Sequence, residues 1–162
     1  MAIPGVLNDN LCWLLSRASH ALTTELTAAL EELGFGPRGH MVLVAADEGQ
    51  FTQIELARMV GLDKTTMVVT VDELEASGLA ERRPSPTDRR ARIIAVTPAG
   101  RRKLDEATVI MERIRKDVLS ALPAAERKAF VSALARLVGG RLAENTPTAQ
   151  PVRRRARRTV PA

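Results

Sequence analysis

Hydrophobic residues recur at helical spacing along most of this chain. From Leu7 to Leu30, leucine and alanine return every three or four residues, and the pattern stops near Gly34 and Gly36. This spacing places the apolar side chains on one face of a helix, and glycine is common just beyond a helix end. The sequence therefore predicts a long first helix over about 7–33.

Two shorter helices are predicted next. Pro37 is suited to the first position of a helix, where no N–H is needed, and an apolar pattern follows it toward Gly49. Thr52 with Glu55 three residues later is typical of a capping box, which opens a helix that runs through Val60.

A glycine turn and a further helix complete this region. Gly61 breaks the chain, and Asp63 is suited to cap the next helix, which ends near Ser77 and Gly78. Its buried stripe consists of Met67, Val71, Leu74 and Leu79. Because the small Ala57 lets the two helices approach closely, the order helix, turn, helix predicts a helix-turn-helix.

Two short strands are predicted over 79–83 and 90–96. The loop between them, PSPTD, contains prolines and Asp88, which favour a turn. The segment contains five arginines: Arg82, Arg83, Arg89, Arg90 and Arg92. We therefore expect a mainly α fold with one small, basic β-hairpin directly after the helix-turn-helix.

Positive charge is concentrated in two segments. Residues 81–103 hold eight basic and two acidic side chains, and residues 145–162 hold five arginines and no acid, within a net charge of +5. Neutralisation of phosphates dominates affinity for nucleic acids, so this distribution is typical of a polyanion-binding face, and a solvated basic surface is the equal alternative. Residues 145–162 also lack apolar periodicity and are predicted to form a disordered basic tail.

Length and residue content exclude several classes of protein. A chain of 162 residues suits one domain, which is predicted over 1–144. No apolar run in the sequence approaches the ~20 residues that are needed to cross a bilayer. Without a signal-peptide pattern, the expected compartment is the cytoplasm. One cysteine and two distant histidines suit neither a disulfide nor a metal site, and the motifs of an enzyme are missing from the sequence. We expect no metal, no cofactor and no catalysis.

The second helix of the helix-turn-helix has side chains suited to DNA. Its predicted outer face consists of Thr65, Thr66, Val69, Thr70 and Glu73, and Lys64 is the first residue of the helix. Short hydroxyl side chains can donate to phosphates and touch base edges in the major groove, while Lys64 adds charge. A helical hairpin with capping threonines is the alternative. The basic hairpin that follows favours DNA, because arginine suits the negative potential of a minor groove.

Four motifs in this order resemble the MarR family of winged helix-turn-helix transcriptional regulators. The resemblance spans about residues 7–142, and the matching segments are DKTTM from Asp63, VDELEASGL from Val71, TDRR around Asp88 and VTPAG from Val96. Many relatives have basic residues where this chain has Val69 and Glu73, which suggests weaker direct base readout or contacts with thymine methyl groups.

The resemblance implies a DNA-binding lobe over about 37–100 between dimerisation helices over about 7–33 and 98–142. It implies that Arg90 enters the minor groove, that Asp88 braces it, and that the threonines at the start of the recognition helix face the major groove. Such a protein is a homodimer that acts as a repressor at a pseudo-palindromic operator. A nonspecific architectural protein whose arginine tail provides the affinity is an alternative.

Dimerisation is also indicated by the flanking helices. Pro98 begins a long amphipathic helix, and Pro123 begins a last one that ends at Gly139 and Gly140. Together with the first helix they have more apolar surface than a three-helix DNA-binding unit can cover. Burial against a second copy of the chain explains this surface, and an intramolecular bundle is the alternative.

Regulators of this family often respond to small aromatic acids, bound where the DNA-binding lobe meets the dimerisation helices. The candidate ligand-binding residues are Trp13, Arg17, His20 and His40. An indole wall and an arginine suit a planar carboxylate. The alternative is that Trp13 is interface core, Arg17 forms a surface ion pair and His40 is a hydrogen-bonded polar group.

Redox sensing through Cys12 is a second alternative. The segment NLCWLL resembles the peroxide-sensing OhrR branch, in which tyrosines stabilise a reactive thiolate. This chain has no tyrosine, and Ser16 stands where one is expected. Without an activating donor, a cysteine with apolar neighbours is more often inert.

Overall fold

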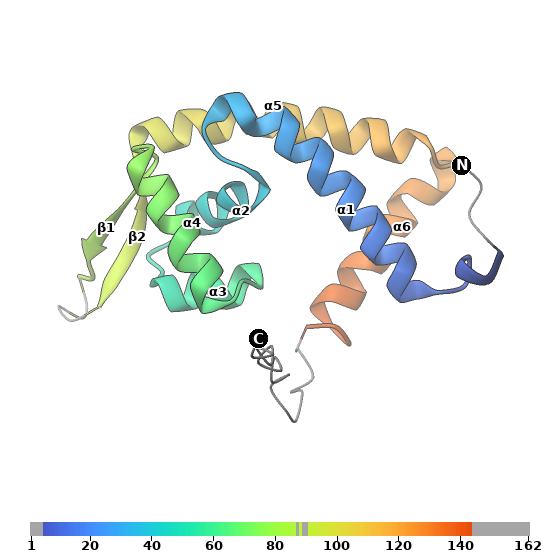
Figure 1. The fold of residues 1–162 in the computed structure, drawn as a ribbon, viewed down its shortest axis with the longest axis horizontal. Coiled ribbons are helices and arrows are strands. Elements are labelled where there is room, and N and C mark those ends of the chain that lie inside the picture. Colours follow the sequence, from blue (N-terminus) through green and yellow to red (C-terminus); the bar gives the residue numbers. More distant parts are fainter. Residues whose placement is uncertain (1–4, 87, 89–90, 144–162) are drawn as a thin grey trace, which may run out of the picture. The chain divides into compact units, whose positions relative to one another are not determined.

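The computed structural model of the protein describes residues 5–86, 88 and 91–143. These residues fall into two compact units, the first ending at Val118 and the second beginning at Leu119. The helices are α1 (Leu11–Leu30), α2 (Pro37–Asp47), α3 (Gln53–Val60), α4 (Lys64–Ala76), α5 (Pro98–Ser120) and α6 (Ala124–Gly139), with 3-10 turns η1 (Gly5–Leu7) and η2 (Glu31–Leu33). The strands are β1 (Ala80–Pro84) and β2 (Arg92–Val96). The predicted mainly α fold with one β-hairpin is confirmed (Figure 1).

Local capping explains where the helices begin. The first helix starts at Leu11 rather than near Leu7, because the Asn10 side chain accepts from the Trp13 N–H at 2.9 Å and thereby fixes the first turn. The predicted starts of α2 and α3 are confirmed: Pro37 occupies the first turn of α2, and the capping box between Thr52 and Glu55 opens α3. Pro123 was expected inside the last helix but is its N-cap, so α6 begins one residue later, at Ala124.

The helix-turn-helix of α3 and α4 depends on one glycine with a left-handed backbone. Gly61 has a φ angle of 70°, a backbone conformation that residues with a Cβ adopt only with strain. Beyond this turn, α4 packs through a buried stripe of Met67, Val71 and Leu74, as predicted. Leu43 of α2 and Leu56 of α3 belong to the same core, which fixes the orientation of α4.

The hairpin runs alongside α4 (Figure 1). Its antiparallel register pairs Ala80 with Val96 at the base and Pro84 with Arg92 toward the tip. Ile93 and Ile94 of β2 are buried, and the Ile94 N–H donates to the Phe51 carbonyl at 3.0 Å, so the hairpin base is anchored to the helical core. The predicted strands, 79–83 and 90–96, differ from these only at their ends.

The start of α5 is fixed against the base of the hairpin. The Thr97 hydroxyl donates to the Gly78 carbonyl at 2.7 Å and accepts from the Gly100 N–H at 3.0 Å. A Cβ at Gly100 would collide with the Leu79 carbonyl, so this close approach requires glycine. The N-terminal end of α5 therefore has a fixed place relative to α4 and to the β1–β2 hairpin, which we call the wing.

The second unit contains α6, none of whose residues is buried. Large apolar side chains are exposed there, including Phe130, whose exposed fraction is 51%, and Val138. In the first unit, Leu11 and Leu22 of α1 and Val109 of α5 are exposed as well. Within the described part of the chain, no helix is both long and apolar enough to span a membrane.

Candidate nucleic-acid interface and adjoining cleft

The N-terminus of α4 is held by a single carboxylate. Asp63 accepts from the N–H groups of Thr65 at 2.9 Å and Thr66 at 3.0 Å, and from the Thr66 hydroxyl at 2.6 Å. These bonds, with that of the Thr66 hydroxyl foremost, lower the pKa of Asp63 below its ordinary value. The predicted cap is confirmed, and it keeps the first turn of α4 ordered.

This capped turn exposes part of the predicted outer face. Lys64, Thr65 and Val69 are exposed, and Thr66 is half-buried beside its cap. The expectation that Thr70 lies on the outer face is wrong. Only 5% of its surface is exposed, and its hydroxyl donates to the Thr66 carbonyl at 2.8 Å within the helix.

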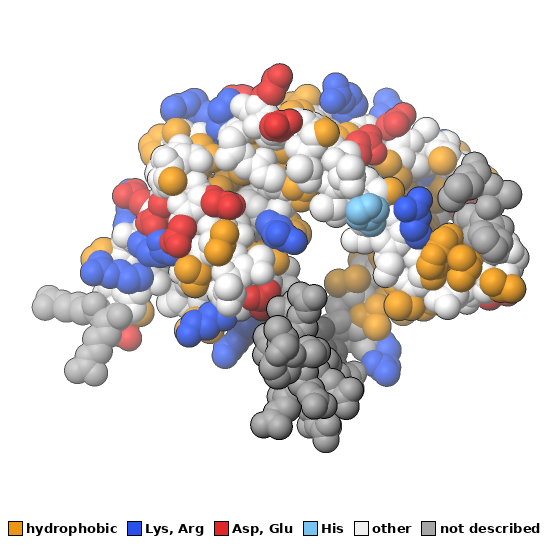
Figure 2. Space-filling model, in the orientation of Figure 1, with side chains coloured by type: hydrophobic (Ala, Val, Ile, Leu, Met, Phe, Trp, Pro, Cys, Tyr) orange, Lys and Arg blue, Asp and Glu red, His pale blue; other side chains and the backbone are white. Residues whose placement is uncertain are grey.

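The arginines of β1 have different surroundings. Acidic and basic side chains gather side by side over α4 and β1 (Figure 2). Arg82 forms an ion pair with Asp72 at 2.7 Å, a second with Glu75, and a hydrogen bond to the Gln53 side chain at 3.2 Å. Its backbone N–H also donates to Glu75 at 2.7 Å. Arg82 was predicted as a DNA contact, whereas its guanidinium joins the wing to α3 and α4.

Two other arginines of the hairpin, Arg83 and Arg92, are more exposed than Arg82. The Arg83 Nε donates to Glu81 on the same strand at 2.9 Å, and Arg92 is exposed at the start of β2. At the tip, the Asp88 N–H lies 3.3 Å from the Ser85 hydroxyl and its carbonyl accepts from the Ala91 N–H at 3.0 Å, which closes the turn. Arg89 and Arg90, predicted to contact DNA, lie outside the described residues.

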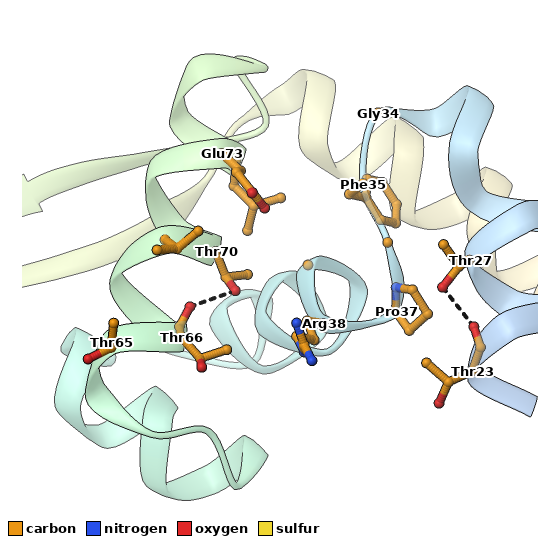
Figure 3. Close-up of a pocket in the computed structure, with 14 residues that line it drawn as sticks. Thr23, Thr27, Gly34, Phe35, Pro37, Arg38, Thr65, Thr66, Thr70 and Glu73 are labelled. Carbon is orange, nitrogen blue, oxygen red and sulfur yellow. Dashed lines mark hydrogen bonds between the residues drawn. The ribbon is translucent and has the colours of Figure 1, made fainter. Parts of the chain in front are cut away.

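A cleft of about 470 Å³ adjoins α4, the second helix of the helix-turn-helix and therefore the recognition helix. Its walls come from α1, from the segment that leads into α2, and from α4 (Figure 3). Side chains that line it include Thr23, Thr27, Phe35, Arg38, Thr66 and Glu73. In Figure 3 Arg38 lies between α1 and α4, and Phe35 lies above it on the segment that leads into α2. Because α4 forms one wall, a molecule in this cleft would contact the helix expected to enter the major groove.

The residues predicted to bind a ligand are mostly elsewhere. Trp13 and Arg17 do not line the cleft beside α4, and His20 lines a more open hollow on the α1 side of Phe35. His40 stacks on Phe35 with ring centroids 6.3 Å apart, and burial lowers its pKa. Arg38, a cation just after Pro37 in the first turn of α2, lines the cleft and is not among the residues predicted from the sequence.

Two other predictions concern metal and thiol chemistry. In residues 5–86, 88 and 91–143, no group of three His, Cys, Asp or Glu side chains is arranged to hold a metal ion. Cys12 is an exposed free cysteine in the first turn of α1.

The chain is similar to known regulators in both sequence and structure. Residues 33–91 match the model of the MarR family. A MarR-family regulator from Rhodococcus sp. RHA1 is 31% identical, with 83% of this chain and 96% of that chain covered and a TM-score of 0.74. CouR from Rhodococcus jostii RHA1, bound to p-coumaroyl-CoA, is also 31% identical, with 88% and 98% covered and a TM-score of 0.73.

A further structure shows a relative on DNA. The transcriptional repressor CouR bound to a 23-mer DNA duplex is 28% identical over 85% of this chain and 99% of that chain, with a TM-score of 0.76. The similarity thus extends over nearly the whole length of these regulators, and from α1 through the wing the described elements follow the predicted order. This chain belongs to the MarR family of transcriptional regulators.

Proposed function

We propose that two copies of this chain bind a pseudo-palindromic operator and repress transcription. In each copy α4 lies in a major groove and the wing reaches the neighbouring minor groove. The observation that carries this proposal is the capped start of α4, which exposes Lys64, Thr65 and Val69 beside an arginine-rich hairpin. The relative CouR is a repressor that has been captured on a DNA duplex, which supports the same use of this fold here.

Homodimerisation is supported by apolar side chains that neither unit buries. They include Leu11 and Leu22 of α1, Val109 of α5, and Phe130 and Val138 of α6. Exposed apolar residues on several helices of one protein are typical of a surface that is covered by a partner. A two-fold dimer places its recognition helices about one turn of DNA apart, ~34–36 Å, which matches a pseudo-palindromic site.

Release from DNA is proposed to follow binding of a small aromatic acid in the cleft beside α4. Arg38 provides a cation for a carboxylate, while Phe35, Val69 and Leu74 provide apolar walls. The cleft also contains residues of the exposed face of α4. A bound acid therefore favours an orientation of α4 that differs from the one that fits DNA, and it releases the operator in this way. The relative CouR binds p-coumaroyl-CoA, an aromatic acyl thioester.

The experiment that tests DNA recognition compares two duplexes of equal length. The full chain is titrated against DNA from upstream of its own gene and against a random sequence, each at two salt concentrations. A specific regulator should prefer the upstream duplex by about 1,000-fold or more at physiological salt. Equal affinity for both duplexes would instead support the architectural alternative, in which charge alone provides binding.

A further inference from the structure

We infer that α4 recognises its operator through the C5-methyl group of thymine, and that Val69 is the residue that contacts this group. The inference rests on the DNA-binding role proposed above. It deepens that role because it names the base that faces Val69 in each half-site and the chemical group by which this base is identified. It follows that a duplex with uracil in place of thymine is a poor operator.

Val69 lies in the middle of the exposed face of α4. On one flank of this face, Asp72 forms an ion pair with Arg82 of the wing. On the other flank, Thr70 is buried at the cleft. With 3.6 residues per turn, Val69 falls between these flanks, and 51% of its surface is exposed. Thr65, one turn earlier, is exposed on the same side of the helix.

The side chains of α4 offer few ways to read a base by hydrogen bonds. Arginine, asparagine and glutamine, which make bidentate contacts with guanine or adenine, do not occur in this helix. The Thr66 hydroxyl is used by the cap, because it donates to Asp63 at 2.6 Å. Valine has neither a donor nor an acceptor, so Val69 can distinguish bases only by an apolar contact. In the major groove the C5-methyl of thymine provides that contact.

The distribution of charge along α4 limits how the helix enters the groove. Its second half has three acidic side chains, Asp72, Glu73 and Glu75, and Glu73 has no ion pair among the residues that the structure describes. Phosphates repel this acidic half and attract Lys64 at the other end of the helix. The first two turns of α4 therefore approach the bases, and they contain Val69.

An exposed valine is unfavourable for the helix itself. β-branched side chains have a lower helix propensity than alanine, leucine or lysine, and Val69 does not recover this cost by burial in the core. A residue that opposes local propensity without a packing gain indicates a functional position. The same branching restricts the side chain to one main rotamer, so its methyl groups are already placed before DNA binds and little side-chain entropy is lost on contact.

The test compares the upstream duplex with the same duplex synthesised with deoxyuridine in place of every thymidine, without added ligand. Uracil lacks only the C5-methyl group, so base pairing and the minor-groove edge that the wing meets are unchanged. Burial of one methyl group changes affinity about fourfold. The full chain should therefore bind the uracil duplex about 15-fold more weakly, about fourfold for each half-site, while its affinity for a random duplex should not respond to the same replacement.

Single replacements locate the contact along the DNA. Exchange of one thymidine at a time should confine the loss to one position in each half-site, symmetric about the centre of the operator. At that position, 5-methylcytosine should be bound about fourfold more tightly than cytosine, because Val69 responds to the methyl group and not to the hydrogen-bonding groups of the base.

Two variants locate the contact along the protein. Val69→Ala removes two methyl groups from the exposed face, so the ratio of the affinities for the thymine and uracil duplexes should fall toward one. The matched control is Val44→Ala, because Val44 is a similarly exposed valine, 43%, that lies on α2 and does not line the cleft. It should keep the full ratio, and melting curves verify that both variants are folded.

Three outcomes would overturn the inference. Preference for the upstream duplex with equal affinity for its thymine and uracil forms would refute methyl readout and leave the proposed function in place. A loss with uracil that persists undiminished in Val69→Ala would assign the contact to another residue. Equal affinity for the upstream and random duplexes would refute the proposed function and the inference together, because a protein without sequence preference reads no base.

Discussion

Arg82 is expected to position the wing rather than to contact DNA. Its guanidinium pairs with Asp72 and Glu75 of α4 and reaches Gln53 of α3, so it joins the first strand of the wing to both helices of the helix-turn-helix. The perturbation is Arg82→Gln, which removes the charge and the long planar donor group. It should allow the wing to move relative to α4 and should therefore weaken operator binding.

The magnitude follows from the exposure of the three charged groups. The Arg82 and Glu75 side chains are 29% and 30% exposed, so this pair belongs near the upper end of the ~0.2–1 kcal/mol typical of surface pairs. The Asp72 carboxylate is 58% exposed and its pair contributes less. With the bond to Gln53, the free energy of unfolding should fall by about 1–2 kcal/mol. For a chain of this size this lowers Tm by about 2–8 °C.

The decisive assay combines DNA affinity with its salt dependence. Loss of a phosphate contact reduces the slope of log K against log salt by about one, whereas loss of a positioning residue leaves the slope unchanged. Arg82→Gln should therefore lower affinity at every salt concentration without a change in slope. Arg92→Gln is the matched control, because Arg92 is an exposed arginine of the same hairpin, and its slope should fall by about one if it meets a phosphate.

A second variant separates positioning from charge. Glu75→Gln makes the protein more positive, so simple electrostatics predicts tighter DNA binding. Positioning predicts weaker binding, because Arg82 loses the acceptor that also holds its backbone N–H. If Glu75→Gln binds the operator more tightly while Arg82→Gln flattens the salt slope, the reasoning is refuted and Arg82 is a DNA contact.

Three further predictions test the wing, the tail and the helix cap. Arg90→Ala should sharply weaken operator binding in a titration while Tm and the dimer stay unchanged; unaltered affinity would show that the wing tip does not enter the DNA. Removal of the residues after Glu144 should flatten the salt slope and leave the preference for the operator intact, and a truncated dimer without that preference would contradict this. Asp63→Ala should lower Tm at neutral pH. The pKa of Asp63 is lower in the folded state than its ordinary value of about 3.8, so the ionised cap stabilises the fold fully above that value. This stabilisation is lost as the pH falls through the lower folded-state pKa, so the difference in Tm between the variant and the parent protein should shrink there. A difference in Tm that does not depend on pH would exclude this cap.

Local features of the sequence predicted most of the fold. The starts of α2, α3 and α4 were found because Pro37, the Thr52 and Glu55 pair, and Asp63 act within one helical turn of themselves. The turn at Gly61 has the same local origin. The start of α1 was placed too early, because apolar spacing continues through Leu7 while the Asn10 cap determines where the helix begins.

The site was less predictable because its chemistry depends on tertiary packing. The cleft combines residues of α1, α2 and α4, and no single segment shows that Arg38 shares a cavity with Glu73. Trp13 and Arg17 are a plausible pair of residue types for an aromatic acid, and they lie near the start of α1, before Thr23, which lines the cleft. The residue type alone does not show which turn of a helix faces a given cavity.

For Arg82, in contrast, a usable signal was present in the sequence. Alternate residues of a strand share a face, so Arg82 lies on the side of Ala80, which is buried, and Arg83 lies on the other. A run of two arginines in a strand therefore cannot place both guanidinium groups on one DNA-facing surface. The inward arginine then requires acceptors, and α4 supplies them in Asp72 and Glu75. The same acids that lower the net charge of the recognition helix thus fix the wing beside it, which explains why an acidic helix can belong to a DNA-binding lobe.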